Sequence, residues 1–149
     1  MIGEPAPLAI ALGDPAGIGP EVILGAWTRL RSQRRAPPAF VVGGPELLRA
    51  AAEALRIDCP IVPIAEPAEA VFAAGAGLPV MAGLDAPWAP GQPSPEGARL
   101  ALASLQWATR FALSGVAALA AEIVRHLNQA GLPKGVLNVV NGDKDAVDA

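Results

Sequence analysis

The residues best suited to chemistry form one short stretch near the start of the chain, GDPAGIGPE, residues 13–21. Three glycines among seven residues allow positive φ angles and let a ligand or a second backbone approach closely. Pro20 suits the first position of a helix, and Glu21 complements the positive end of the helix dipole. Such a loop leaves backbone N–H groups able to hold a phosphate or a carboxylate. The glycine spacing fits neither the dinucleotide fingerprint nor a P-loop, so an anion site and a structural turn both remain open.

The elements around this stretch predict an α/β fold. The apolar run from Leu8 to Leu12 is typical of a buried strand, and a helix should follow from Pro20 to about Gln33. Its buried face should hold Ile23, Trp27 and Leu30, with Trp27 in the core rather than on a cofactor.

The same pattern then returns, with a strand at 39–42, the residues Gly43-Gly44-Pro45-Glu46, and a helix to about Arg56. Two successive strand and helix units imply a parallel sheet with right-handed crossovers, and ligands gather at the carboxyl ends of such strands. We therefore expect a three-layer α/β/α arrangement with a mainly parallel sheet. A further strand is predicted near Ile61 and Val62, a loop over most of residues 65–79, and another strand over 79–83.

A long helix is predicted from Pro95 to about Leu113, because Ser94 is a good N-cap and Pro95 fits the first helical position. Its buried face should consist of the small and apolar residues at helical spacing, Ala98, Ala101, Leu105, Ala108 and Phe111 or Ala112. Leu102 and Trp107 widen this stripe. Such a surplus of apolar surface indicates a helix between layers or a dimer surface.

Composition narrows the class of protein. A chain of 149 residues is sized for one domain, spanning residues 1–149, with 52% hydrophobic and 17% charged residues. The net charge of −3 favours neither nucleic acid nor an anionic membrane as a partner. The one cysteine, Cys59, excludes an internal disulfide and fits a cytoplasmic location, and we expect a buried or idle thiol there. No stretch is long and apolar enough to predict a membrane span.

The stretch GDPAGIGPE resembles the opening of the 4-hydroxythreonine-4-phosphate dehydrogenase family of vitamin B6 biosynthesis, and VVGGPELL and PGQPSPEGARLALASLQWATRFALSG are similar to later segments of it. The resemblance covers residues 8–119. It implies NAD-dependent oxidation, with decarboxylation, of a small phosphorylated substrate, a divalent metal, and a dimer. The candidate cofactor-binding residues are then Gly13, Asp14, Gly17, Gly19 and Glu21.

Residues 121–149 resemble a different family. The segment AGLPKGVLNVVNGDKDAVDA is similar to part of the NAD-binding domain of the aldehyde dehydrogenase superfamily. Its end is similar to the methylmalonate-semialdehyde dehydrogenase branch of that superfamily. The sequence thus looks like two incomplete pieces that meet near Ala120, truncated relative to the family resembled first. A helix is expected over 121–130 and a strand over 136–140.

Two functions from different classes follow. The metal implied by the resemblance is held by three histidines, whereas this chain has only His126, which we expect to be an unliganded surface residue. No metal site and no catalytic residue can be assigned. The chain is therefore either a member of the dehydrogenase family whose glycine loop keeps affinity for a phosphate or dinucleotide, or a catalytically silent α/β domain that self-associates. An aldehyde dehydrogenase activity ranks third, since Cys59 lies on the wrong side of the matching segment.

Overall fold

The computed structural model of the chain describes residues 7–31 and 38–113, with side chains as far as Phe111. The chain divides into two units, and all described residues belong to the first, Met1–Ala118. The helix and strand predicted within 121–140, His126, and the junction predicted near Ala120 lie outside the described residues.

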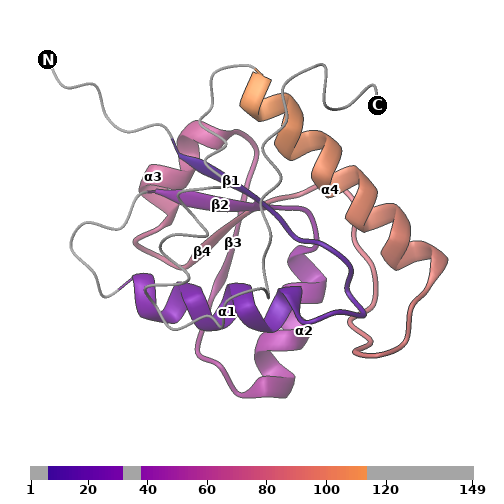
Figure 1. Cartoon of the computed structure of the whole chain (residues 1–149). Coiled ribbons are helices and arrows are strands. Elements are labelled where there is room, and N and C mark those ends of the chain that lie inside the picture. The colour runs from indigo at the N-terminus through magenta and orange to yellow at the C-terminus, as the bar shows by residue number, and fades with distance from the viewer. Residues whose placement is uncertain (1–6, 32–37, 114–149) are drawn as a thin grey trace, which may run out of the picture. The chain divides into compact units, whose positions relative to one another are not determined.

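Strands and helices alternate along the described part (Figure 1). The elements are β1 (Leu8–Ala11), α1 (Gly19–Leu30), β2 (Ala39–Val42), α2 (Pro45–Leu55), β3 (Ile61–Ile64), the 3₁₀ turn η1 (Pro67–Glu69), α3 (Ala70–Ala73), β4 (Leu78–Met81) and α4 (Pro95–Leu113). The predictions for β2 and α4 are confirmed at the same bounds. The prediction of a loop over most of 65–79 is wrong where η1 and α3 form. Pro67 opens this turn, and the Glu69 Oε2 accepts a hydrogen bond of 2.9 Å from Ala65 N.

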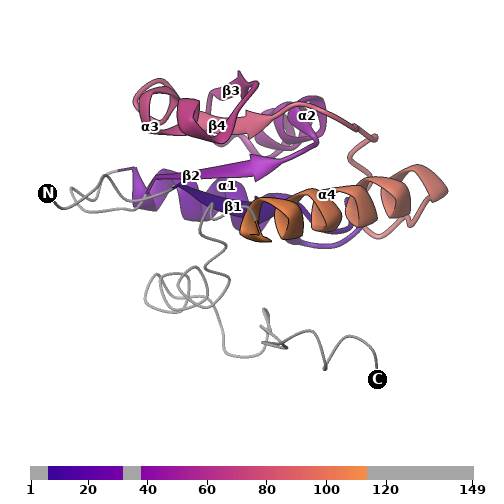
Figure 2. The ribbon, with the colours of Figure 1, turned by 90° about the horizontal axis from the view of Figure 1, so that it is seen from above.

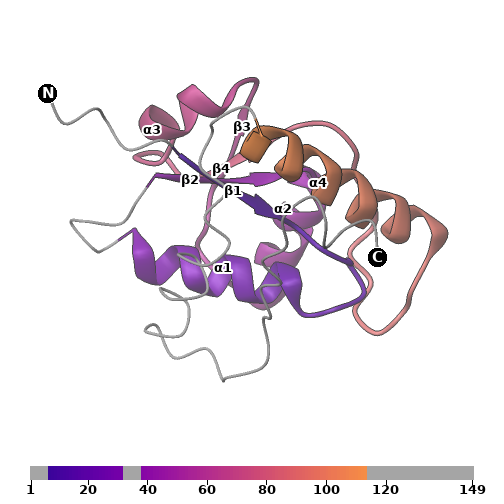
Figure 3. The same ribbon diagram turned by 45° about the horizontal axis from the view of Figure 1, so that its top comes forward.

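The sheet is four-stranded and parallel throughout, in the order β1-β2-β4-β3. The chain moves in one direction from β1 through β2 to β3 and then turns back to β4. Right-handed crossovers place helices on opposite faces when this direction reverses. Accordingly α1 and α2 lie on one face, and α3 and α4 lie on the other (Figures 2 and 3). The predicted three-layer α/β/α architecture is confirmed.

Two apolar clusters hold these layers together. On the face covered by α1 and α2, Leu24 and Trp27 pack in one cluster with Val41 of β2. On the other face, Phe40 is fully buried and its ring meets that of Phe111 edge to face, with 5.7 Å between centroids. The prediction that Trp27 belongs to the core is therefore confirmed. The predicted face of α1 was incomplete, since it left out Leu24, which is fully buried.

The predicted buried face of α4 is right only in part, because Ala108 is buried and Phe111 packs on Phe40 as expected, whereas two other members are exposed. Ala98 is exposed, and Leu105 keeps 57% of its surface in solvent. The buried residues of the helix recur three or four positions apart, and two of them lack an apolar side chain. They are Gly97, Leu100, Ser104 and Ala108, of which only Ala108 was predicted. A count of apolar side chains overlooks Gly97 and Ser104, although Gly97 lies against Pro15 and Ser104 bonds to the backbone of Leu12 and Val42.

Candidate binding site at the carboxyl edge of the sheet

Two glycine loops follow neighbouring strands at the carboxyl edge of the sheet. β1 leads through Leu12 into Gly13, with φ 79°, and β2 leads into Gly43 and Gly44, with φ 82° and 75°. These left-handed conformations suit glycine because a side chain would be strained there. Each loop opens a helix with proline in its first turn. The repeated strand, glycine and proline pattern in the sequence therefore places both loops at the edge where parallel sheets bind ligands.

The first loop is a tight turn tied to itself. The Asp14 Oδ1 accepts a hydrogen bond of 2.9 Å from Ala16 N, and Gly17 N donates to the Asp14 carbonyl at 3.0 Å. Gly19 packs directly on the preceding strand, since a Cβ there would lie 2.6 Å from the Leu12 carbonyl oxygen. The need for glycine at position 19 is thus explained by backbone packing alone.

The helix that this loop opens remains suited to an anion. Ile18 stands at the N-cap of α1 and makes no side-chain cap, so the positive end of a 12-residue helix faces the loop. Gly17 adds little bulk, and a Cβ built there meets only the Asp14 carbonyl oxygen, at 3.4 Å. Glu21 works against an anion, because its partly buried carboxylate lies in the first turn with the Oε2 enclosed and unpartnered among the described residues.

The second helix start is already occupied by a carboxylate of the chain. The Asp85 Oδ2 accepts from Glu46 N at 2.8 Å, and its Oδ1 accepts from Leu47 N at 3.1 Å. Gly44 N donates to the Leu84 carbonyl at 3.0 Å, so the segment after β4 closes over this loop. The sequence analysis missed Asp85, although an aspartate just after a strand at the carboxyl edge is a recognisable signal.

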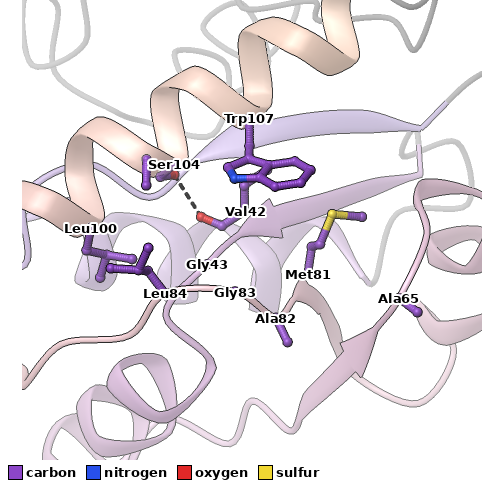
Figure 4. Close-up of a pocket in the computed structure, with 11 residues that line it drawn as sticks. Val42, Gly43, Ala65, Met81, Ala82, Gly83, Leu84, Leu100, Ser104 and Trp107 are labelled. Atoms are coloured by element: carbon purple, nitrogen blue, oxygen red, sulfur yellow. Dashed lines mark hydrogen bonds between the residues drawn. The ribbon is translucent and has the colours of Figure 1, made fainter.

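A small cavity of about 140 Å³ lies beside these loops, at the ends of β2, β3 and β4 and beneath α4 (Figure 4). Val42, Met81 and Trp107 stand around it, and all of its lining side chains are uncharged. The residues of the lining are Val42, Gly43, Ala65, Met81, Ala82, Gly83, Leu84, Leu100, Ala103, Ser104 and Trp107. None of the five predicted cofactor-binding residues is among them. The anion-suited loop and this apolar cavity are therefore separate features of the same edge.

One buried hydroxyl connects α4 to both loops. Ser104 is 2% exposed, and its Oγ accepts a hydrogen bond of 2.8 Å from Leu12 N. The same hydroxyl donates to the Val42 carbonyl at 2.7 Å (Figure 4). The sequence analysis missed Ser104 as well. Its spacing of four from both Leu100 and Ala108 is the signal that identifies it.

The described residues do not fit a divalent metal. Residues 7–31 and 38–113 contain no group of three or more His, Cys, Asp or Glu able to hold an ion. Cys59 is buried, as predicted, and burial raises the pKa of its thiol more than the nearby Arg31 lowers it. A thiol of this kind is a poor nucleophile at neutral pH.

No helix in residues 7–31 and 38–113 is both long and apolar enough to cross a bilayer.

Comparison with known proteins finds relatives of this chain. No model of a known protein family matches the chain. The 4-hydroxythreonine-4-phosphate dehydrogenase of Erythrobacter litoralis is 53% identical over 115 residues, a match that covers 76% of this chain and 34% of the relative. This chain is similar to 4-hydroxythreonine-4-phosphate dehydrogenases. The enzyme of that name from Methylorubrum populi is 39% identical over 120 residues, covering 78% of this chain and 34% of the relative.

Solved structures agree with this similarity. The crystal structure of the 4-hydroxythreonine-4-phosphate dehydrogenase from Klebsiella pneumoniae matches with a TM-score of 0.57 and 29% identity, over 74% of this chain and 34% of that one. The chain thus spans about a third of the length of the dehydrogenases it matches. The resemblance predicted for residues 8–119 is confirmed. The resemblance of residues 121–149 to an aldehyde dehydrogenase stays a prediction, since the relatives named above are all 4-hydroxythreonine-4-phosphate dehydrogenases.

Proposed function

We propose that this chain takes part in the reaction of the 4-hydroxythreonine-4-phosphate dehydrogenases, the NAD-dependent oxidation and decarboxylation of 4-phosphooxy-threonine in pyridoxal phosphate biosynthesis. The observation that carries the proposal is the 53% identity over 115 residues. The position of both glycine loops at the carboxyl edge supports it, because ligands of open parallel sheets bind there. The substrate class is then a small phosphorylated hydroxy acid, and the compartment the cytoplasm.

The loop from Gly13 to Glu21 is proposed to hold a phosphate of NAD. The N-terminus of α1 carries no side-chain cap, and its dipole favours a negative group. The small Gly17 lets such a group approach the backbone, and Asp14 keeps the turn in shape through its bond to Ala16 N. When bound, NAD supplies the acceptor for the hydride that leaves the substrate's hydroxyl-bearing carbon.

Turnover is not proposed for the described residues alone. The resemblance implies a divalent metal held by three histidines, whereas residues 7–31 and 38–113 offer no cluster that fits one. We therefore propose that these residues bind the dinucleotide, and that any metal-dependent step relies on groups outside them.

The test is calorimetric titration of the whole chain with NAD, using a matched pair of glycine variants. Gly17→Ala adds a methyl group where the phosphate would approach, with only an ordinary contact to the Asp14 carbonyl. Gly25→Ala adds the same group within α1, where a Cβ meets nothing within 4 Å. We expect one NAD per chain, weakened by about tenfold or more, or about 1.4 kcal/mol, in Gly17→Ala and unchanged in Gly25→Ala.

The opposite result is equally clear. If the folded chain shows no heat of binding up to millimolar NAD, the loop is a structural turn and the proposal fails. A titration repeated with Zn²⁺ or Mg²⁺ examines the metal, because tighter NAD binding with metal would place metal ligands outside the described residues.

A second candidate is a catalytically silent domain that self-associates as a homodimer. The exposed apolar side chains of α4 favour it, since Leu102, Leu105 and Trp107 keep 58%, 57% and 49% of their surfaces in solvent. Sedimentation velocity of Leu105→Glu tests this candidate, with Gln106→Glu as a control that adds the same charge at the next exposed position. A dimer that Leu105→Glu alone dissociates supports it, and a monomer at all concentrations excludes it.

A further inference from the structure

The hydroxyl of Ser104 occupies an unusual place between two strands. Its Oγ accepts from Leu12 N and donates to the Val42 carbonyl, joining backbone positions 92 and 62 residues away in sequence. Leu12 immediately precedes Gly13, and Val42 immediately precedes Gly43. The one hydroxyl is thus bonded to the last residue before each glycine loop.

The parallel ladder shows what this hydroxyl replaces. At the start of the pair, Leu8 N donates to the Pro38 carbonyl at 2.8 Å, and the register then runs from Leu8↔Ala39 to Ala11↔Val42. Ladder bonds between parallel strands are evenly spaced. Four residues further along both strands, the same bond would run from Leu12 N to the Val42 carbonyl. The Ser104 hydroxyl lies between these two groups.

This insertion separates the strand ends. Two hydrogen bonds in series, of 2.8 and 2.7 Å, stand where a direct backbone bond of about 2.9 Å would close the ladder. Both backbone groups stay satisfied, which matters because a buried unpaired donor or acceptor is costly. The strands β1 and β2 therefore part at their carboxyl ends without a loss of hydrogen bonding.

We propose that Ser104 is a positioning residue, whose hydroxyl holds the ends of β1 and β2 apart and so sets the geometry of the loop from Gly13 to Glu21 for its ligand. The ligand-binding part of this inference rests on the proposed function above. A methyl group in its place, as in Ser104→Val, still keeps the strands apart but leaves Leu12 N and the Val42 carbonyl without their partner. This loss frees the end of β1 and moves the first loop.

The test compares two variants of the same shape in the whole chain. Ser104→Thr keeps the hydroxyl and Ser104→Val replaces it with a methyl group, and the added methyl has the neighbouring cavity beside it. Thr109→Val is the control, because it removes a hydroxyl of the same helix that bonds only the Leu105 carbonyl. The readout is amide hydrogen exchange by NMR at Leu12, compared with Ala51, a fully buried residue of α2.

In Ser104→Val we expect Leu12 exchange to rise at least about tenfold more than Ala51 exchange, with resonance shifts at Gly13 and Gly43. Ser104→Thr and Thr109→Val should leave that ratio within about twofold of wild type. A role in overall stability alone would speed both amides equally and leave the resonances of Gly13 and Gly43 in place, and this result would overturn the proposal. Equal behaviour of the Thr and Val variants would also overturn it.

Two further measurements test the role of Ser104 even if a variant fails to fold or the chain fails to bind NAD. In the wild-type chain the Ser104 hydroxyl proton should be protected and show a nuclear Overhauser effect to Leu12 N–H, and its absence would contradict the inserted hydroxyl. If wild type binds NAD, Ser104→Val should bind about tenfold or more weakly and Ser104→Thr normally. If wild type binds no NAD, the proposed function fails, while the exchange ratio and the shifts at Gly13 and Gly43 still decide whether Ser104 bridges the strand ends and positions the loops.

Discussion

Replacement of Asp85 by alanine should destabilise the chain through the start of α2. The carboxylate receives hydrogen bonds from Glu46 N at 2.8 Å and Leu47 N at 3.1 Å, and Gly44 at the N-cap has no side chain to replace it. Loss of an N-capping side chain costs about 0.5–2 kcal/mol, and loss of a negative charge at a helix N-terminus a further 0.3–1 kcal/mol or so. We expect Asp85→Ala to lower the free energy of unfolding by about 2 kcal/mol. Asp85→Asn, which keeps one acceptor oxygen, should lose roughly half of that.

Urea and thermal denaturation of the whole chain measure this effect. A loss of about 2 kcal/mol corresponds to a fall in Tm of roughly 4–8 °C for a domain of this size. Asp58→Ala is the control, because that side chain is 91% exposed and its pair with Arg31 spans 3.9 Å. Its removal should cost less than about 1 kcal/mol. Equal losses in the two variants, or a change below about 0.5 kcal/mol in Asp85→Ala, would refute the capping role.

Two further predictions concern single side chains. Gly19→Ala should lower the free energy of unfolding by about 1–3 kcal/mol, because its Cβ would lie 2.6 Å from the Leu12 carbonyl oxygen. Gly25→Ala should instead raise it by up to about 1 kcal/mol. Urea denaturation of the two variants measures both changes. Cys59 should react with iodoacetamide more slowly than free cysteine at pH 8, because its raised pKa lowers the thiolate fraction. The rate of this reaction should keep rising at higher pH. A rate equal to that of free cysteine would contradict the burial of Cys59.

Local signals in the sequence were enough to place most elements. Proline in the first turn of α1, α2 and α4 marks where each helix starts, and Ser94 caps the last of them through a 3.0 Å bond from Gly97 N. These signals involve residues only a few positions apart, so they can be recognised in the sequence before the fold is known. The three-layer arrangement follows from the repeated strand and helix units and the handedness of their connections.

The contacts that shape the edge were beyond the sequence analysis because they join distant residues. Ser104 reaches backbone groups 92 and 62 residues away, and Asp85 reaches groups 39 and 38 residues away. Helical periodicity counts apolar side chains, so it placed the exposed Ala98 and Leu105 on the buried face of α4 and left out Ser104. For the first loop, the sequence was compatible with both a structural turn and an anion site. Packing against Leu12 explains why residue 19 is glycine, but it fits both interpretations.

The central claim is that the loop from Gly13 to Glu21 binds a dinucleotide, and an NAD titration followed on the backbone amide resonances of the whole chain tests it most directly. The account predicts saturable shifts at Gly17, Gly19 and Glu21, with smaller ones at Leu12 through its bond to Ser104. Unchanged resonances in this loop up to millimolar NAD, or shifts confined to Trp107 and the apolar cavity, would contradict it.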